Sequence, residues 1–430
     1  MTESESPADE IVSRARELSL SAVPAASRDG QAIAFPPLPA GDRFRFRAVS
    51  AATNAVNRVR EAETKWRTRN VSDTGGHTGE AVPALHQSTQ TMRPWDAVSN
   101  DTLAIQALLR RNGYRSEIFA EHIDPSLRDR VRSIDQLSDR AYAEDAVLVH
   151  VCVHAPRVMR ALEAHEGELH LRFHSNTPPE WFKGISYGLE LSARKGWEEM
   201  ARLSHRCVSA IADSAHNERE VRSVGMADVV VVPILLAPAD DPPTWTGGGG
   251  YAISVGRIAP NKRVDFLLRT VAAYQQLHDP EFGLVLVGSD RGLERYSAAC
   301  RELEQELGVR NVRWVGSVEE AEKLRLLAAA DAYLCASDHE GFCVPIVESF
   351  RLGLPVVARA TSAVTDTCGS ALAVDTADPA LLANVLRVVV GDADLRARLV
   401  ATQDREAARF DPERVGEQVL SWARAHVMLP

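Results

Sequence analysis

Apolar and polar positions alternate along most of this chain in blocks that predict short buried strands separated by amphipathic helices. Two series of such blocks are present, and each is typical of a parallel α/β domain. The first series has strand-like runs at residues 116–119, 146–153, 169–173, 208–212 and 229–232 and a helix at 100–111. The second has strand-like runs at 253–255, 284–287, 312–315, 332–336 and 356–357, with helices at 264–277, 293–307 and 321–330.

The boundaries between these series predict the domain organisation. The first domain is expected at residues 91–245 and the second at 246–408. The glycine run Gly247–Gly250 stands between two predicted strands rather than between a strand and a helix, which favours an interdomain joint over a phosphate loop. A last helix is expected within residues 409–430, because Val415, Val419, Leu420 and Trp422 share one side of it.

The first 90 residues form an extension of different character. Residues 1–42 are rich in Ser, Ala, Pro and acidic residues without a sustained period, and we expect little fixed structure there. Residues 43–70 predict an amphipathic helix with eight Arg or Lys against two Glu, followed by a linker up to residue 90. This basic helix could lie on an anionic membrane or dock on another helix or on the protein itself. Its weak apolar side favours docking.

Composition limits the cellular compartments and the partners that can be expected for this protein. The 430 residues are 45% apolar and 25% charged with a net charge of −10, so nucleic acid is not an expected partner. No run of 18 apolar residues is present, and the acidic N-terminus does not resemble a signal peptide. We therefore expect a cytoplasmic protein, with any membrane contact peripheral at the inner face. The six cysteines contain no C-x-x-C pair, which predicts reduced core thiols.

Residues 338–348 combine a strand end, a tight loop and a helix start at Pro345. The free N–H groups and the dipole of such a helix attract phosphate. Two carboxylates flank the loop. Glu348 could accept hydrogen bonds from the adjacent hydroxyls of a ribose, and Glu340 could face a sugar. Alternatively, Glu348 only favours the helix dipole and Glu340 is a solvated turn residue.

Two further positions could carry chemistry. Arg257 and Lys262 lie five residues apart on a loop after the first strand of the second domain, where both could converge on one anion or could be ordinary surface cations. His174 follows a parallel strand at the edge where such sheets bind ligands, or it is a structural histidine. No Gly-x-Gly-x-x-Gly follows any predicted strand, which argues against an NAD-binding domain.

The spacing Glu340-x7-Glu348, with Gly341-Phe342 inside it and Gly256-Arg257…Lys262 about 80 residues earlier, resembles the retaining glycosyltransferases of family 4. The resemblance extends over residues 91–430 and is strongest in 251–375. It implies the GT-B fold, in which two doubly wound Rossmann-like domains face each other across a cleft. The second domain would hold the nucleotide sugar and the first the acceptor, with the last helix crossing back to the first domain.

The resemblance also implies a reaction and a set of roles. A hexose would pass from a nucleoside-diphosphate sugar to an acceptor hydroxyl with retention, in polysaccharide or glycoconjugate biosynthesis. Arg257 and Lys262 would hold the diphosphate, and Glu348 the ribose. Glu340 and His174 would act at the donor sugar. The backbone N–H groups of the loop would also bind the diphosphate. These belong to Gly341, Phe342, Cys343 and Val344. The commonest family pattern has Gly in place of Cys343, so the cysteine is expected to narrow the donor pocket.

The sequence signals for the acceptor-binding residues are less specific than those for the donor site. The loop before the first helix lacks the glycine pair that many family members carry. Asp96 and Ser99 are then candidate acceptor contacts, although Ser99 or Asn100 could instead cap the helix. His154 could line the crevice, with a satisfied core histidine as the alternative. The acceptor itself could be a glycan, a lipid-linked glycan or a small molecule.

No metal or other cofactor is expected. Asp392-Ala393-Asp394 has the spacing of a metal motif of other glycosyltransferases, but it stands at a predicted helix start and is interpreted as a cap. The nucleotide sugar is then a co-substrate of a metal-independent reaction. Two alternatives remain open from the sequence: a non-catalytic GT-B scaffold or partner subunit at the membrane, and a GT-B epimerase or phosphorylase.

Overall fold

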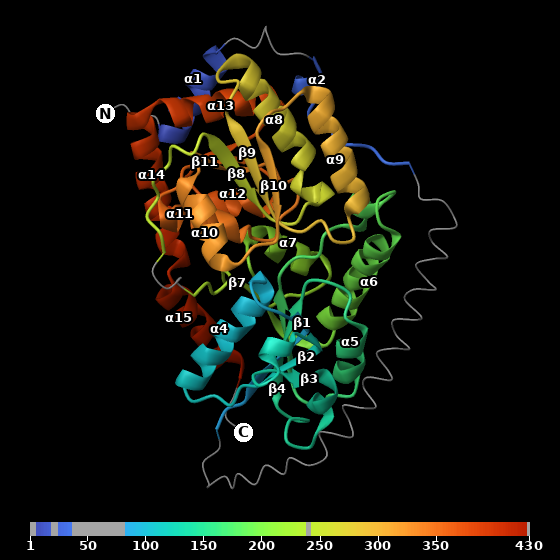
Figure 1. Cartoon of the computed structure of the whole chain (residues 1–430). Helices are drawn as coiled ribbons and strands as arrows, with labels where there is room; N and C mark the ends of the chain where they lie inside the picture. The colour runs from blue at the N-terminus through green and yellow to red at the C-terminus, as the bar shows by residue number, and fades with distance from the viewer. Residues whose placement is uncertain (1–5, 19–24, 37–81, 238–241, 428–430) are drawn as a thin grey trace.

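A computed structural model of the chain describes residues 6–18, 25–36, 82–237 and 242–427. The predicted basic helix at 43–70 lies outside the described residues. Within them the chain forms two α/β domains stacked end to end, with the second domain above the first in Figure 1. This confirms the GT-B architecture that the resemblance implies.

The first domain is built on a seven-stranded parallel sheet of order β3-β2-β1-β4-β5-β6-β7. The strands are β1 (Leu85–Met92), β2 (Ile118–Ile123), β3 (Arg132–Ser133), β4 (Ala146–Val151), β5 (Leu169–Phe173), β6 (Cys207–Ala212) and β7 (Val229–Val231). The α-helices are α4 (Ala97–Arg111), α5 (Pro156–Glu163), α6 (Tyr187–Ser204) and α7 (Ala215–Ser223), with short 3-10 turns at Pro125–Leu127, Ile134–Ser138 and Pro179–Phe182.

The second domain has a six-stranded parallel sheet of order β10-β9-β8-β11-β12-β13. Its strands are β8 (Tyr251–Val255), β9 (Gly283–Val287), β10 (Val312–Gly316), β11 (Ala332–Cys335), β12 (Val356–Arg359) and β13 (Ala373–Val374). Its helices are α8 (Val264–Leu277), α9 (Glu294–Leu307), α10 (Glu320–Ala329), α11 (Val344–Leu352), α12 (Ser362–Cys368), α13 (Pro379–Gly391) and α14 (Ala393–Ala407), with 3-10 turns at Pro260–Lys262 and Ala408–Phe410.

Side-chain caps begin several helices, as the sequence predicts for Asp392. Asp392 accepts from the backbone N–H groups of Asp394 and Leu395 at the start of α14, so the Asp-x-Asp spacing serves as a cap. Ser214 accepts from the N–H of Asn217 at the start of α7. Each cap satisfies N–H groups that have no partner inside the helix.

The first strand of the first domain was not predicted. The sequence predicts a linker up to residue 90, but β1 begins at Leu85 and lies between β2 and β4 in the middle of the sheet. Its polar residues His86, Gln87, Ser88 and Thr89 are all buried. A central strand normally has a continuous apolar run, and this one instead carries side chains of a buried polar network.

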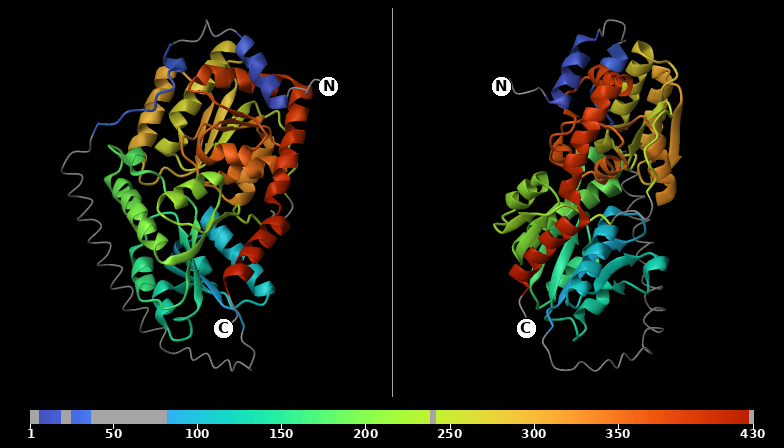
Figure 2. Two further views of the ribbon diagram at one scale, coloured as in Figure 1. Left: turned by 180° about the vertical axis from the view of Figure 1, so that it is seen from behind. Right: turned by 90° about the vertical axis from the view of Figure 1, so that its left-hand side faces the viewer.

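The expectation of little fixed structure over residues 1–42 is wrong for the part that is described. Helix α1 (Pro7–Glu17) begins at the cap Ser6 and buries Ile11 and Ala15 completely in the core of the second domain. It lies against α13, as Figures 1 and 2 show, and Arg14 forms an ion pair of 2.6 Å with Asp392. A short helix, α2 (Ala25–Arg28), follows.

The last helix, α15 (Pro412–His426), returns from the second domain to the first (Figure 2, right). Val415, Val419, Leu420 and Trp422 pack with residues of β1, β4 and α4 in one apolar cluster. Trp422 also donates a hydrogen bond of 3.2 Å from Nε1 to Ser209 on β6. Within the second half of the chain, the polypeptide passes from one domain to the other between β7 and β8 and again just before α15.

All six cysteines are free thiols, and five of them are buried. Among the described residues, no helix is long and apolar enough to span a bilayer.

Replacing Ile11 by Ala tests whether α1 is part of the second domain. Because Ile11 has no exposed surface, the change should lower the unfolding free energy of that domain by about 2–4 kcal/mol. Denaturant unfolding of the full chain would measure it. Leu18→Ala is the matched control, since Leu18 is 36% exposed at the end of the same helix and should change stability by less than about 0.5 kcal/mol. Equal effects of the two changes would contradict the packing of α1.

Candidate functional site

The loop between β11 and α11 forms the centre of the candidate site. It leaves the sheet after Cys335 and enters α11 at Val344, so the N-terminus of this helix points out of the sheet edge. Cys343 immediately before the helix has a φ of 73°, a left-handed conformation that a glycine adopts without strain. Its thiol is buried 3.9 Å from the hydroxyl of Tyr333. The cysteine side chain therefore lies in the protein interior beside Tyr333. Its effect on the width of the donor pocket stays a prediction.

Lys262 and Glu340 meet at this loop. Lys262 Nζ lies 2.5 Å from Glu340 Oε2, and Glu340 Oε1 accepts a hydrogen bond of 2.7 Å from the Ser337 hydroxyl. Burial opposes the charge of the Lys262 ammonium, but Glu340 outweighs it and raises the pKa of this lysine. Glu340 is thus not a solvated turn residue. It fixes a charged lysine, whose two remaining N–H donors can serve a ligand.

Arg257 stands on the same side of the loop, and a small pocket is lined by Gly256, Arg257, Lys262, Tyr333 and Ser337 among others. Arg257 donates to the Arg291 carbonyl oxygen at 3.3 Å. The surrounding protein and then the positive charge of Arg93 lower the pKa of Arg257. Arg93 follows β1 of the first domain, so two arginines from the two domains lie close enough to repel each other. A site that gathers like charges in this way is suited to an anion.

Arg93 is not among the site residues predicted from the sequence. The feature that indicates a functional role for Arg93 is its position directly after a strand of the first domain, at the sheet edge that faces the second domain. Because the sequence does not predict β1, it does not indicate that Arg93 lies at this sheet edge. The neighbouring Trp95 is 59% exposed with a φ of 57°, which leaves a large aromatic face on the same loop.

Glu348 lies one turn into α11 and contacts α10 rather than Lys262. Its Oε1 is 2.8 Å from Lys323 Nζ, and Lys323 also pairs with Glu320 at 2.9 Å. Burial raises the pKa of Glu348, and Lys323 opposes this shift only in part. Its Oε2 is buried without a hydrogen-bond partner. A carboxylate oxygen left unpaired in the interior is a natural acceptor for a ligand hydroxyl.

His174 does not face the second domain as predicted. Its side chain is only 2% exposed and lies within the first domain, with Nδ1 2.8 Å from Asp213 and Nε2 2.8 Å from His150 Nδ1. His150 Nε2 is 2.9 Å from Gln87 Oε1. In this structure His174 is therefore a member of a buried polar chain. Its backbone, not its ring, reaches the domain boundary.

Hydrogen bonding assigns the protons of this chain. Gln87 donates its amide to the Thr102 carbonyl, so its oxygen faces His150 and His150 Nε2 must donate. Burial, followed by the charges of His174 and Arg172, holds the pKa of His150 far below its usual range, so this ring is neutral and its Nδ1 accepts. His174 joins the two ends of this chain, with Nε2 next to the accepting Nδ1 of His150 and Nδ1 next to the Asp213 carboxylate.

The buried network also contains an arginine and two carboxylates. Arg172 is fully buried and pairs with Asp101 at 2.8 Å and with Asp213 at 3.2 Å. Asp101 also accepts from the backbone N–H of Leu235 after β7. The network ties α4, β5, β6 and the segment that leaves the first domain into one rigid unit.

The two domains approach each other closely at Gly341. A Cβ added to this glycine would lie 2.5 Å from Ser175 Cβ and 2.7 Å from the His174 carbonyl oxygen. Both distances are shorter than real carbon contacts, so only glycine permits this closure. Gly341 and His174, which the resemblance implies on opposite sides of the cleft, are therefore neighbours through backbone contact.

The predicted acceptor contacts have structural partners. Asp96, not Ser99 or Asn100, caps α4 and accepts from the Ser99 N–H at 3.0 Å. Ser99 is fully buried, and its hydroxyl lies 2.9 Å from Asp96 and accepts from the Arg93 N–H at 3.1 Å. Ser99 thus cannot touch an acceptor in this conformation. His154 is held by Glu199 at 2.6 Å, which favours the structural alternative for this residue.

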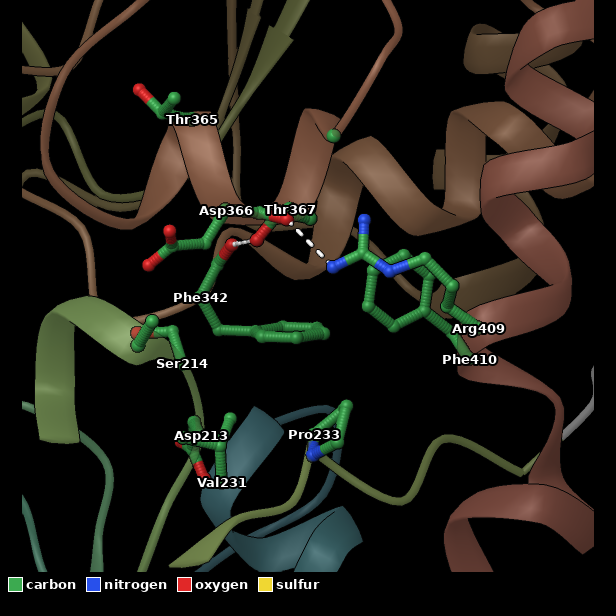
Figure 3. Close-up of a pocket in the computed structure, with 12 residues that line it drawn as sticks. Asp213, Ser214, Val231, Pro233, Phe342, Thr365, Asp366, Thr367, Arg409 and Phe410 are labelled. Atoms are coloured by element: carbon green, nitrogen blue, oxygen red, sulfur yellow. Dashed lines mark hydrogen bonds between the residues drawn. The ribbon is translucent and has the colours of Figure 1, made fainter.

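A pocket of about 340 Å³ opens between the domains on the side of the interdomain crossings (Figure 3). Phe342 reaches into it from the loop and meets the ring of Phe410 edge to face at 5.4 Å between centroids. The first domain contributes Asp213, Ser214, Val231 and Pro233 to its wall. Thr367 donates to the Phe342 carbonyl oxygen. The contacts of Phe342 with Phe410 and Thr367 hold the loop in place at this pocket. Arg257 and Lys262 do not line the pocket.

Comparison with known families identifies the second domain. Residues 241–405 match the family described as glycosyl transferases group 1. The second domain is a glycosyl transferases group 1 domain. It contains both the Arg257–Lys262 turn and the Glu340–Glu348 segment described above.

Two curated relatives that match this domain are named for inositol compounds. The D-inositol 3-phosphate glycosyltransferase of Salinispora arenicola is 36% identical over 177 residues, which cover 38% of this chain and 39% of that enzyme. The phosphatidyl-myo-inositol mannosyltransferase of Mycobacterium leprae is 26% identical over 276 residues, which cover 61% of this chain and 68% of that enzyme. The chain thus spans about two fifths of the length of the first of these relatives.

The two-domain fold also has solved counterparts. The structure of HepE from Anabaena in complex with UDP and glucose has a TM-score of 0.62 to this chain. The aligned residues cover 80% of this chain and all of the HepE chain, and 17% of them are identical. The likeness extends over both domains, beyond the segment that the family matches.

Replacing Gly341 by Ala tests the close approach of the domains. The added methyl group would overlap Ser175 and the His174 carbonyl, so the domains must separate or the loop must shift. If closure is needed for turnover, kcat/KM should fall by about tenfold or more, for a strain of about 1–3 kcal/mol. Steady-state kinetics measures this once a donor is known.

Gly416→Ala is the control for this substitution. A Cβ at Gly416 would meet Leu108 at an ordinary 3.4 Å on α15. Gly416→Ala should therefore keep wild-type kinetics. Unchanged kinetics in Gly341→Ala would show that the contact between Gly341 and the first domain is not needed for turnover.

Proposed function

We propose that this protein is a retaining glycosyltransferase that moves a hexose from a nucleoside-diphosphate sugar to an acceptor hydroxyl, in polysaccharide or glycoconjugate biosynthesis. The observation that carries the proposal is the set of cations around the N-terminus of α11, with Arg257 and Lys262 on the second domain and Arg93 on the first. These groups surround a position where a diphosphate would meet positive charge from both domains.

The diphosphate would be held without a metal ion. In a glycosyl transfer the bond between the anomeric carbon and the diphosphate oxygen breaks, and negative charge grows on the leaving group. Lys262 and Arg257 stabilise that charge directly, and the free N–H groups at the start of α11 add the positive end of a helix dipole. Glu340 keeps Lys262 charged and aimed at the site.

The ribose would be held by Glu348. Its unpaired Oε2 supplies the acceptor that a ribose hydroxyl needs, while Lys323 fixes the other oxygen at 2.8 Å. A hydroxyl that fills this vacancy removes the penalty of an unsatisfied buried oxygen, so nucleotide binding gains about 1–3 kcal/mol from this contact. Glu348 thereby selects a nucleotide with free ribose hydroxyls.

Retention would proceed without a protein nucleophile. Glu340 is engaged by Lys262 and Ser337, and the ring of His174 is buried, so neither is free to attack the anomeric carbon. In the proposed route the acceptor oxygen forms its bond on the face that the diphosphate leaves. The acceptor proton passes to an oxygen of the departing phosphate. Trp95, exposed beside Arg93, offers an aromatic face for the acceptor.

The relatives support a phosphorylated or lipid-linked polyol as one class of acceptor. Those named above are a D-inositol 3-phosphate glycosyltransferase and a phosphatidyl-myo-inositol mannosyltransferase, and HepE was solved with UDP and glucose. A sugar nucleotide with a uracil or guanine base is a fitting first choice of donor to test.

A nucleotide screen tests the donor site. UDP, GDP, ADP and dTDP are titrated into metal-free protein by calorimetry and thermal shift. One of the ribonucleotides is expected to bind and to raise Tm. Glu348→Gln should weaken it by about tenfold, because an amide accepts less strongly than a carboxylate.

Glu320→Gln is the matched control for Glu348→Gln. Glu320 pairs with the same Lys323 but is 38% exposed on α10 and should leave nucleotide affinity unchanged. Binding of none of the four nucleotides would contradict the proposal and favour a non-catalytic scaffold.

The stereochemical outcome tests the proposed route. With the donor found in the screen and an inositol phosphate as the trial acceptor, proton NMR of the fresh product should show the anomeric configuration of the donor. Glu340→Gln should slow the reaction without changing this configuration, since Glu340 positions Lys262 and is no nucleophile in this account. An inverted product would overturn the proposed route.

A further inference from the structure

Three side chains meet at the domain boundary beside the donor loop. His216 and Glu220 are one turn apart on α7 of the first domain, so they share one face of that helix. His339 belongs to the second domain and immediately precedes Glu340. The three belong to neither the predicted donor site nor the buried histidine chain of the first domain.

The distances within this trio do not fit hydrogen bonds. His216 Nε2 and His339 Nε2 each lie 3.6 Å from Glu220 Oε1. A separation of 3.6 Å is too long for a hydrogen bond between nitrogen and oxygen. One atom from each of the three residues lies within 4.8 Å of the others.

Each member of the trio also has a buried polar atom without a partner. These atoms are His216 Nε2, Glu220 Oε2 and His339 Nε2. The His339 side chain is only 9% exposed, so water reaches it poorly. An unsatisfied buried polar atom costs about 1–3 kcal/mol, so a ligand that satisfied these atoms would stabilise the domain boundary.

Two other groups of potential ligands exist in the described part of the chain, and neither is free in this way. In the group of Asp101, His150 and His174, the two rings are hydrogen-bonded to each other at 2.8 Å. In the group of Cys335, Glu340 and Cys343, the carboxylate is taken by Lys262.

We propose that His216, Glu220 and His339 bind a divalent transition-metal ion, with Zn²⁺ the best match, and that this ion joins the two domains. Two imidazoles and one carboxylate are a common zinc ligand set, with water in the fourth position. Zinc bonds of about 2.0–2.2 Å in tetrahedral geometry separate ligand atoms by about 3.4 Å. The observed 3.6 Å needs only a small adjustment. Imidazole ligands do not favour Mg²⁺ or Ca²⁺.

The ion would act on the arrangement of the domains. Because its ligands come from both of them, it binds the closed state and not an open one, and so stabilises closure. The start of α7 already touches the second domain, where the His216 N–H donates to Asp366 at 2.7 Å. The ion would also hold the loop that carries Glu340. It takes no part in the chemistry at the diphosphate, and the proposal does not depend on the proposed reaction.

Metal titration of the full chain tests this inference. Chelator-treated protein is titrated with Zn²⁺ by calorimetry, and Co²⁺ is added to a second sample for visible spectroscopy. We expect one high-affinity ion per chain, the visible bands of tetrahedral Co²⁺ and a rise in Tm that chelation reverses. Glu220→Gln and His339→Gln should each weaken binding by about 10- to 100-fold or more, the loss that even supporting residues cause at metal sites.

The control is His205→Gln, which removes an exposed histidine at the end of α6 and should bind the ion as the wild type does. If His339→Gln does not fold, His216→Gln on the partly exposed helix face replaces it. Three results would overturn the proposal: no binding, binding that survives both substitutions, or an intense near-ultraviolet band from thiolate to Co²⁺. The last would point to the cysteines near Glu340 instead.

Discussion

The close contact of Gly341 with the His174–Ser175 backbone constrains the rest of the structure. Because this loop of the second domain touches the first, the cations after β8 face the loop after β1 across a short distance. The buried network of Arg172, His174 and two carboxylates makes the first-domain side of this contact rigid. The contact between the rings of Phe342 and Phe410 makes the second-domain side of the contact rigid as well. The anion site is thus made by closure and not by either domain alone.

Much of the fold could be predicted from the sequence because most strands of both sheets are continuous apolar runs. Helix α8 was predicted with the bounds that the structure has. Strand β1 was missed because it carries buried polar side chains that no hydrophobic period marks. Helix α1 was missed because its apolar stripe is short and is completed only by the surface of α13, more than 360 residues later in the chain. The local hydrophobic pattern of a helix does not indicate a packing partner that lies so far away in the sequence.

The candidate site was predicted unevenly for a similar reason. Arg257, Lys262 and Glu340 lie on loops whose position follows from strand order, and the structure brings them together. The ring of His174 was expected in the cleft, but strand alternation fixes only the backbone, and Asp213 draws the side chain inward. Arg93 was overlooked with its strand. The trio of His216, Glu220 and His339 joins two domains, and no spacing in the sequence indicates such a contact.

The central claim is that charge from both domains holds one diphosphate. Calorimetric titration of the bound nucleoside diphosphate and of its monophosphate into wild type, Arg93→Gln and Arg257→Gln tests it most directly. The account predicts that the diphosphate binds more tightly than the monophosphate. It also predicts that either substitution reduces this preference by about tenfold, the value of a charged hydrogen bond. An unchanged preference in Arg93→Gln would contradict the claim, because the first domain would then contribute no charge to the site.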